Sequence, residues 1–189
     1  HTDDLVSFDT AQWASLATDD LQALTTGQWQ ALATDDLRAL STAQWSSLAT
    51  DDLQALTTGQ WPQMATDDLV GLQAQIQWAA IATDDLQALT TAQWSALATD
   101  DLMALNAIQW QAAESEDLRV LSGTQWAQMA TNDLVALTTA QWLSMESGDL
   151  QALTAVQWSQ MAPDDLITLG TDQWAAMATD DLRALTPVQ

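Results

Sequence analysis

The 189-residue chain has no cysteine, no tyrosine and no lysine, and its one histidine is the first residue. Without cysteine there is no disulfide and no thiolate metal site. With a single terminal histidine, neither a Ser-His-Asp nor a Cys-His catalytic arrangement can be assembled. The six glycines are scattered singly, which excludes a glycine-rich phosphate loop. We therefore expect no enzymatic activity, and no cofactor unless it is a bound cation.

Positive charge is almost as scarce. Only Arg38, Arg119 and Arg183 stand against 26 acidic residues, and the formal net charge is -23. Nucleic acids and anionic membranes both bind through clusters of Lys and Arg, so both are excluded as partners. No apolar run approaches the roughly 20 residues of a membrane-spanning helix, and no signal peptide is visible. The partners that remain are neighbouring repeats, further copies of the chain, cations, basic proteins and polysaccharides.

What the sequence has in abundance is a repeat. Twelve Asp-Asp-Leu-type units alternate with eleven Gln-Trp units at a period of 16 residues. We call its two 8-residue halves the acidic half, such as residues 18–25, and the tryptophan half, such as residues 26–33. Position 3 of a half is always Asp in the first kind and Gln in the second, and position 4 is Leu or Trp. A short fixed period is typical of a solenoid, whose repeats bury their apolar faces only against neighbouring repeats.

The apolar positions 4 and 7 are three residues apart, which favours one face of a helix, and strand-like alternation is missing. A continuous helix does not fit, because eight residues overshoot two helical turns by about 80°. We expect Thr18 and its equivalents at position 1 to be N-caps, with both aspartates in the first turn. Pro163 and Pro187 also occupy position 1, where a helix can begin, whereas Pro62 at position 5 indicates a short helix. Position 5 varies and is expected to face solvent.

We therefore predict an all-α solenoid of short helices, with two helices per 16-residue coil and almost no loops. The alternative is a β-solenoid with 16 residues per coil. The abundance of Ala, Gln, Leu and Met favours the helical form.

The repeats form one continuous array over residues 2–186. One tryptophan half, residues 74–82, has nine residues, so we expect a one-residue insertion that is absorbed locally. The chain starts and stops inside repeats, and we expect it to be a fragment of a longer array.

The tryptophans share one repeat position and should form a ladder along the solenoid. One interpretation is an aromatic platform for a flat ligand such as a sugar, and the other, which we favour, is a core spine that locks neighbouring coils together. The ladder consists of Trp13, Trp29, Trp45, Trp61, Trp78, Trp94, Trp110, Trp126, Trp142, Trp158 and Trp174.

The paired aspartates allow two interpretations as well. Carboxylates repeated along an array are hard oxygen ligands, which would suit calcium. Alternatively they cap helix N-termini, or bond laterally to glutamine amides or indole N–H groups, and we favour this structural interpretation. The candidate metal ligands are Asp19, Asp20, Asp35, Asp36, Asp51, Asp52, Asp67, Asp68, Asp84, Asp85, Asp100 and Asp101.

The segments Leu24–Gln28, Leu56–Gln60 and Leu89–Gln93 resemble Leu-Thr-Thr-x-Gln short repeats. Such repeats occur in long segments of very large secreted bacterial surface and adhesin-type proteins. The resemblance implies an extracellular stalk, matrix or filament segment exported without disulfides. Our first hypothesis is therefore a bacterial, extracellular or cell-surface structural repeat protein with a Leu/Trp core and an anionic surface. The alternative is a binding module that holds a polysaccharide, a basic peptide or calcium along its repeated Asp and Trp positions.

Overall fold

A computed structural model of the chain describes residues 5, 7–73 and 76–189. Every regular element within these ranges is an α-helix or a 3-10 helix, and none is a strand. The predicted all-α solenoid is confirmed, and the β-solenoid alternative is not supported. The first Asp-Asp pair, at Asp3 and Asp4, lies outside the described residues.

From residue 10 to residue 184, each half-repeat forms one short helix. The acidic helices are α3 (Thr18–Gln22), α5 (Thr34–Ala39), α7 (Thr50–Ala55), α8 (Thr66–Val70), α9 (Thr83–Ala88), α11 (Thr99–Ala104), α13 (Ser115–Leu118), α15 (Thr131–Ala136), α17 (Ser147–Ala152), α19 (Pro163–Thr168) and α21 (Thr179–Ala184). The tryptophan helices are α2 (Thr10–Ser15), α4 (Thr26–Ala31), α6 (Thr42–Ser47), η1 (Trp61–Gln63), η2 (Trp78–Ala80), α10 (Thr91–Ala96), α12 (Ala107–Ala112), α14 (Gly123–Gln128), α16 (Thr139–Ser144), α18 (Ala155–Gln160) and α20 (Thr171–Ala176).

The helices begin one residue away from where we expected the caps. Thr18 is the first helical residue of α3, and the N-cap is Ala17. In α10 the N-cap is Thr90, whose hydroxyl accepts from the Gln93 N–H. The expectation was wrong because the residue at position 8, Ala17 or Thr90, has the extended backbone of an N-cap, and the residue at position 1 is already helical. Asp19 and Asp20 do lie in the first turn, as predicted.

Two extended residues, at positions 7 and 8, join each helix to the next. Leu40 ends α5 with φ -69° and ψ 139°, and Ala49 precedes α7 with φ -71° and ψ 158°. No described residue has a positive φ. The connection therefore needs no special residue, and this permits the unbroken repetition of the same eight-residue unit.

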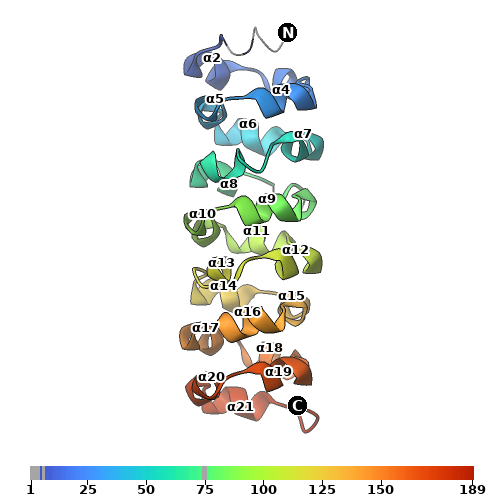
Figure 1. Ribbon diagram of the computed structural model, residues 1–189, viewed down its shortest axis with the longest axis vertical. Helices are drawn as coiled ribbons and strands as arrows, with labels where there is room; N and C mark the ends of the chain where they lie inside the picture. The colour runs from blue at the N-terminus through green and yellow to red at the C-terminus, as the bar shows by residue number, and fades with distance from the viewer. Residues whose placement is uncertain (1–4, 6, 74–75) are drawn as a thin grey trace.

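The helices wind into an elongated superhelix (Figure 1). The principal contacts join helices three apart in chain order, such as α2 with α5 and α14 with α17. Hydrogen bonds also join helices four apart, such as Gln141 of α16 to Trp110 of α12. One turn therefore contains between three and four helices, more than the two per coil that we expected. Two extended residues do not reverse the chain, as a two-helix coil would require.

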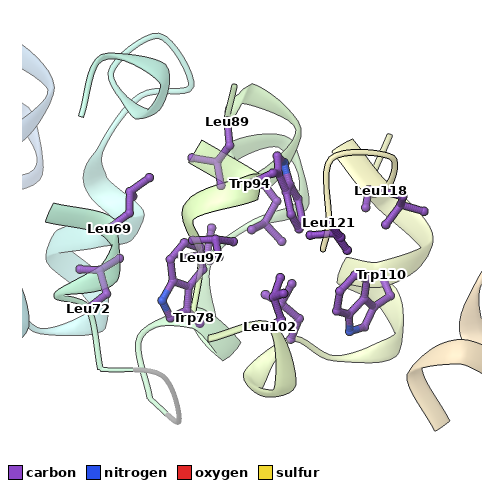
Figure 2. Close-up of a cluster of buried hydrophobic side chains, with 14 of the residues drawn as sticks. Leu69, Leu72, Trp78, Leu89, Trp94, Leu97, Leu102, Trp110, Leu118 and Leu121 are labelled. Atoms are coloured by element: carbon purple, nitrogen blue, oxygen red, sulfur yellow. The ribbon is translucent and has the colours of Figure 1, made fainter. Parts of the chain in front are cut away.

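One continuous apolar core runs along the inside of the superhelix. It consists mainly of the position-4 Leu and Trp side chains together with the apolar side chains at position 7. Figure 2 shows this arrangement for a central segment, where Trp78, Trp94 and Trp110 lie among leucines from several successive helices. Because the core has no gap between repeats, each helix is held by its neighbours and not by its own length.

Two adjacent tryptophan halves depart from the regular helix. Pro62 lacks an N–H, and its half forms the 3-10 helix η1, which confirms that the helix there is short. The nine-residue half forms η2, and Ala74 and Gln75 lie outside the described residues. Gln77 still donates to Trp45 O and Leu48 O, as the glutamine at position 3 does elsewhere. The described part of this half therefore keeps the packing of the array.

Candidate functional site

The glutamines at position 3 form a buried ladder of hydrogen bonds. Gln141 Oε1 accepts from the Thr138 N–H at 2.6 Å and from the Thr138 hydroxyl at 2.9 Å. Its Nε2 donates to Trp110 O at 2.8 Å and to Ala113 O at 2.7 Å. One amide thus closes the N-terminus of its own helix and the C-terminus of a helix four earlier. The sequence showed an invariant position but not this role, because the carbonyl partners lie 28 and 31 residues away.

The same lateral bonds recur along the array. Two carbonyls accept from each of Gln44, Gln60, Gln77, Gln93, Gln109, Gln141, Gln157, Gln173 and Gln189, and Leu97 O accepts from Gln125.

The aspartates at position 3 form a second ladder. Asp101 Oδ2 accepts from the Ala98 N–H at 3.0 Å, which satisfies one free N–H at the start of α11. On its other side such a carboxylate faces an indole, and Trp29 Nε1 donates to Asp52 Oδ1 at 3.1 Å. We anticipated both roles from the sequence, as capping and as a lateral bond to Trp.

In three other repeats the equivalent Asp–Trp pair is not hydrogen-bonded. Trp45 Nε1 and Asp68 Oδ2 are both buried without a partner, and the repeat register places them opposite each other. The same holds for Trp94 Nε1 with Asp117 Oδ2 and for Trp142 Nε1 with Asp165 Oδ2. In each pair the indole N–H donor and the carboxylate acceptor both lack a partner, so a hydrogen bond between them would be favourable.

Burial raises the pKa of these carboxyl groups, because an ionised carboxylate is poorly solvated inside the solenoid. The N-cap N–H groups lower the pKa again in part, while carboxylates at position 2 raise it further. The pKa is raised for Asp52, Asp149 and Asp165, and to about 6 for Asp68, Asp85, Asp101, Asp117 and Asp133.

In most candidate metal pairs the two carboxylates lie in different environments. Position 2 is exposed in Asp19, Asp35, Asp51, Asp67, Asp84 and Asp100, whereas position 3 is buried in Asp52, Asp68, Asp85 and Asp101. Asp36 is half-buried, and Asp20 is exposed. Consecutive residues of a helix point about 100° apart. Within the described ranges, no group of three or more His, Asp or Glu side chains is placed to hold a metal ion.

The tryptophan ladder lies in the core. Ten of the eleven indoles have 0% exposure: Trp13, Trp29, Trp45, Trp61, Trp78, Trp94, Trp110, Trp126, Trp142 and Trp158. Trp174 is partly buried. The rings of Trp94 and Trp110 lie 6.4 Å apart and tilted by 45°, which is a favourable aromatic arrangement. A flat ligand approaching from solvent does not reach these faces.

Contacts that the sequence did not reveal lie at the seams. We define a seam as the contact between an acidic helix and the tryptophan helix three along the chain. At six seams the side chain at position 5 donates to the position-6 carbonyl across the seam: Gln22–Ser47, Arg38–Gln63, Gln54–Ala80, Gln87–Ala112, Arg119–Ser144 and Gln151–Ala176. We call these bridged seams. Position 5 is therefore exposed, as expected, but is not free.

Three further seams carry an apolar residue at position 5. Val70, Met103 and Val135 are 44%, 48% and 44% exposed. They belong to the seams α8/α10, α11/α14 and α15/α18, which we call apolar seams. Bridged and apolar seams alternate from Gln54 to Gln151.

The described part of the chain contains no pocket. None of its helices is long and apolar enough to cross a membrane.

Residues 30–66 match a family described as the ALTTAQ repeat. No curated protein matches the chain. The family match supports the prediction of a repeat family, and the regular helical array fits a structural repeat protein. Whether the chain comes from a large secreted bacterial surface protein stays a prediction.

Proposed function

We propose that the chain is a rigid spacer, a segment of an extracellular filament, stalk or adhesin matrix on a bacterial surface. The observation that carries this proposal is the core, a single apolar column in which helices contact those three away, while the tryptophan helices also bond to helices four away. Such an array is a stiff rod, and added repeats lengthen it without changing its cross-section. Its function is geometric and includes no catalysis, nucleic-acid binding or membrane insertion.

The surface charge supports the same role. Position 2 places exposed carboxylates on helix after helix, and the chain as a whole has a net charge of -23. Neighbouring rods of this kind repel one another, which keeps them apart and attracts cations. The extracellular setting rests on the resemblance to Leu-Thr-Thr-x-Gln repeats of secreted surface proteins, to which the ALTTAQ match adds a named repeat family.

Small-angle X-ray scattering of a deletion series tests the spacer. Deleting residues 99–130 removes four helices, α11 to α14, and joins Ala98 to Thr131 in frame. We expect a rod of unchanged cross-section, proportionately shorter, with unchanged helix content per residue. The matched control deletes only residues 99–106, which places two tryptophan helices in succession and should destabilise the array. A collapse of helicity after the longer deletion would contradict the spacer role.

A calcium titration tests whether the scaffold is self-sufficient. We expect the EDTA-treated chain to be helical by far-UV circular dichroism, with no change on adding calcium at constant ionic strength. A chain that becomes helical only with calcium would make the Asp pairs metal ligands. The surface location is tested by labelling intact bacterial cells with an antibody against the repeats, and label found only after lysis would contradict it.

A further inference from the structure

The apolar seams differ from the bridged seams in the side-chain hydrogen bonds that their position-6 carbonyls accept. At a bridged seam the position-6 carbonyl accepts from Gln or Arg across the seam, as Ala112 O accepts from Gln87 at 2.7 Å. At the apolar seams the equivalent carbonyls belong to Ala96, Gln128 and Gln160. Among the described residues, no side-chain donor bonds to these three carbonyls, and an exposed Val or Met lies where the donor would be.

A carboxylate accompanies two of these sites. Positions 2 and 5 are three residues apart and share one face of the helix. Asp67 therefore lies beside Val70, and Asp100 beside Met103. Both carboxylates are exposed, and no arginine within the described ranges forms an ion pair with either.

A bridged seam shows which chemical group can bond to a position-6 carbonyl and a position-2 carboxylate together. At the bridged seam α13/α16, Arg119 Nε donates to Ser144 O at 3.0 Å. The same guanidinium places NH1 3.2 Å from Glu116 Oε1, at position 2 of its own helix. One guanidinium thus fits between the position-2 carboxylate and the position-6 carbonyl across the seam. At the apolar seams the acceptors are present, but the chain supplies no guanidinium.

We propose that the apolar seams α8/α10, α11/α14 and α15/α18 form a periodic docking surface for a basic polypeptide that carries both arginines and apolar side chains. Its guanidinium groups bond to the position-6 carbonyls, and at the first two seams also to the carboxylates of Asp67 and Asp100. Its apolar side chains pack on Val70, Met103 and Val135. Further exposed apolar side chains lie on the helices of this region, including Val156 on α18, which is 67% exposed. This interaction goes beyond the spacer role, because a rod that only sets a distance has no need of such sites.

Charge selects this partner over a second copy of the chain. A second copy brings the same net charge of -23 and only three arginines. Arg119 and Arg183 form ion pairs within their own helices, and Arg38 donates to Gln63 O. Docking two copies along these seams would therefore oppose carboxylates without adding free cations, whereas a basic partner neutralises them.

The test uses a fluorescent peptide with arginine and leucine at alternating positions, and binding to the full chain is followed by anisotropy. The variant V70Q/M103Q/V135Q places the bridging residue of Gln87 at all three apolar seams and leaves the net charge unchanged. We expect the wild-type chain to bind the peptide and the variant to lose about tenfold or more in affinity. A thermal melt by circular dichroism confirms that the variant folds.

Three controls separate this proposal from its alternatives. A peptide with serine for leucine keeps the arginines but lacks the apolar contacts, and we expect it to bind the wild-type chain more weakly than the arginine–leucine peptide does. Equal binding of the arginine–leucine peptide to wild type and variant, or no binding at all, would overturn the proposal. So would concentration-dependent dimerisation of the wild-type chain in sedimentation experiments that the triple substitution abolishes. The spacer role does not depend on these outcomes, because scattering tests it separately.

Discussion

The acidic and tryptophan helices have almost the same backbone but complete their hydrogen bonds differently. In a tryptophan helix the residue at position 3 is Gln, which accepts from its own N-cap N–H and donates to two carbonyls four helices back. In an acidic helix it is Asp, which accepts at its N-cap and faces an indole N–H three helices back. An Asp carboxylate can only accept a hydrogen bond, and it faces an indole N–H. A Gln amide can also donate, and it faces two carbonyls, so each residue matches its partner.

The N-caps divide in the same way. Tryptophan helices such as α6 begin after Ser41, whose hydroxyl accepts from the Gln44 N–H at 3.3 Å. Acidic helices such as α5 begin after Ala33, which has no side-chain acceptor, and the first-turn carboxylates Asp35 and Asp36 interact favourably with the helix dipole. Two ways of stabilising a helix N-terminus thus alternate along the array, and substitutions at matched positions distinguish them.

The largest loss of stability should come from substitutions at position 4. Replacing Trp110 by Ala removes a fully buried indole and should cost about 3 to 5 kcal/mol, whereas Leu102→Ala in the neighbouring acidic helix should cost about 2 to 5 kcal/mol. Urea unfolding followed by circular dichroism measures both. If Trp110→Ala leaves the unfolding midpoint unchanged, the indole ladder does not hold the core together.

Position 3 should come next. Gln141→Met keeps the length of the side chain but leaves the Thr138 N–H and the carbonyls of Trp110 and Ala113 without this partner. Each buried unsatisfied group costs about 1 to 3 kcal/mol. Thermal denaturation measures the loss, and Gln54→Met at exposed position 5 is the matched control. Equal effects of the two substitutions would show that the buried ladder contributes no more than a surface bond.

The acidic ladder should make stability depend on pH. The folded-state pKa of Asp68, Asp101 and Asp117 is raised to about 6 from an ordinary value of 3.8. The folded chain therefore binds more protons than the unfolded chain between these values, so stability is greatest below about pH 4 and falls as the pH rises through about 6. Urea midpoints measured across this range should fall with increasing pH.

High salt separates this effect from surface repulsion. Salt screens exposed carboxylates strongly and buried ones much less. We expect the pH dependence to become shallower in high salt but to persist. A midpoint that does not vary with pH at high salt would assign the whole effect to surface charge.

The smallest effect should lie at the seams. Val135→Gln offers a donor to Gln160 O and should stabilise by about 0.5 to 1 kcal/mol, the net contribution of one hydrogen bond. The reverse change, Gln87→Val, removes the bond to Ala112 O and should destabilise by a similar amount. Chemical denaturation of the two variants beside wild type shows whether bridged and apolar seams differ in stability. If both substitutions shift the denaturation midpoint in the same direction, the position-5 hydrogen bond does not explain a difference between the seams.

Much of the fold follows from local pattern. The spacing of positions 4 and 7, the first-turn aspartates and the break every eight residues predict short helices with a Leu/Trp face, and the structure has them. Pro62 predicted the short helix at η1 for the same local reason. The N-cap was misplaced by one residue because Thr is a good cap in isolation, whereas the cap before Thr18 is Ala17, which is chosen by its extended backbone.

The sequence by itself therefore determined the helices, their buried faces and the alternation of two half-repeats, because these depend on residues within one or two turns of each other. Only the tertiary structure decided how many helices make a turn, because this depends on the path that positions 7 and 8 give the chain. It also decided the partners of Gln at position 3, Asp at position 3 and the side chain at position 5. Those partners lie between 23 and 32 residues away, at distances that only the winding of the superhelix brings together.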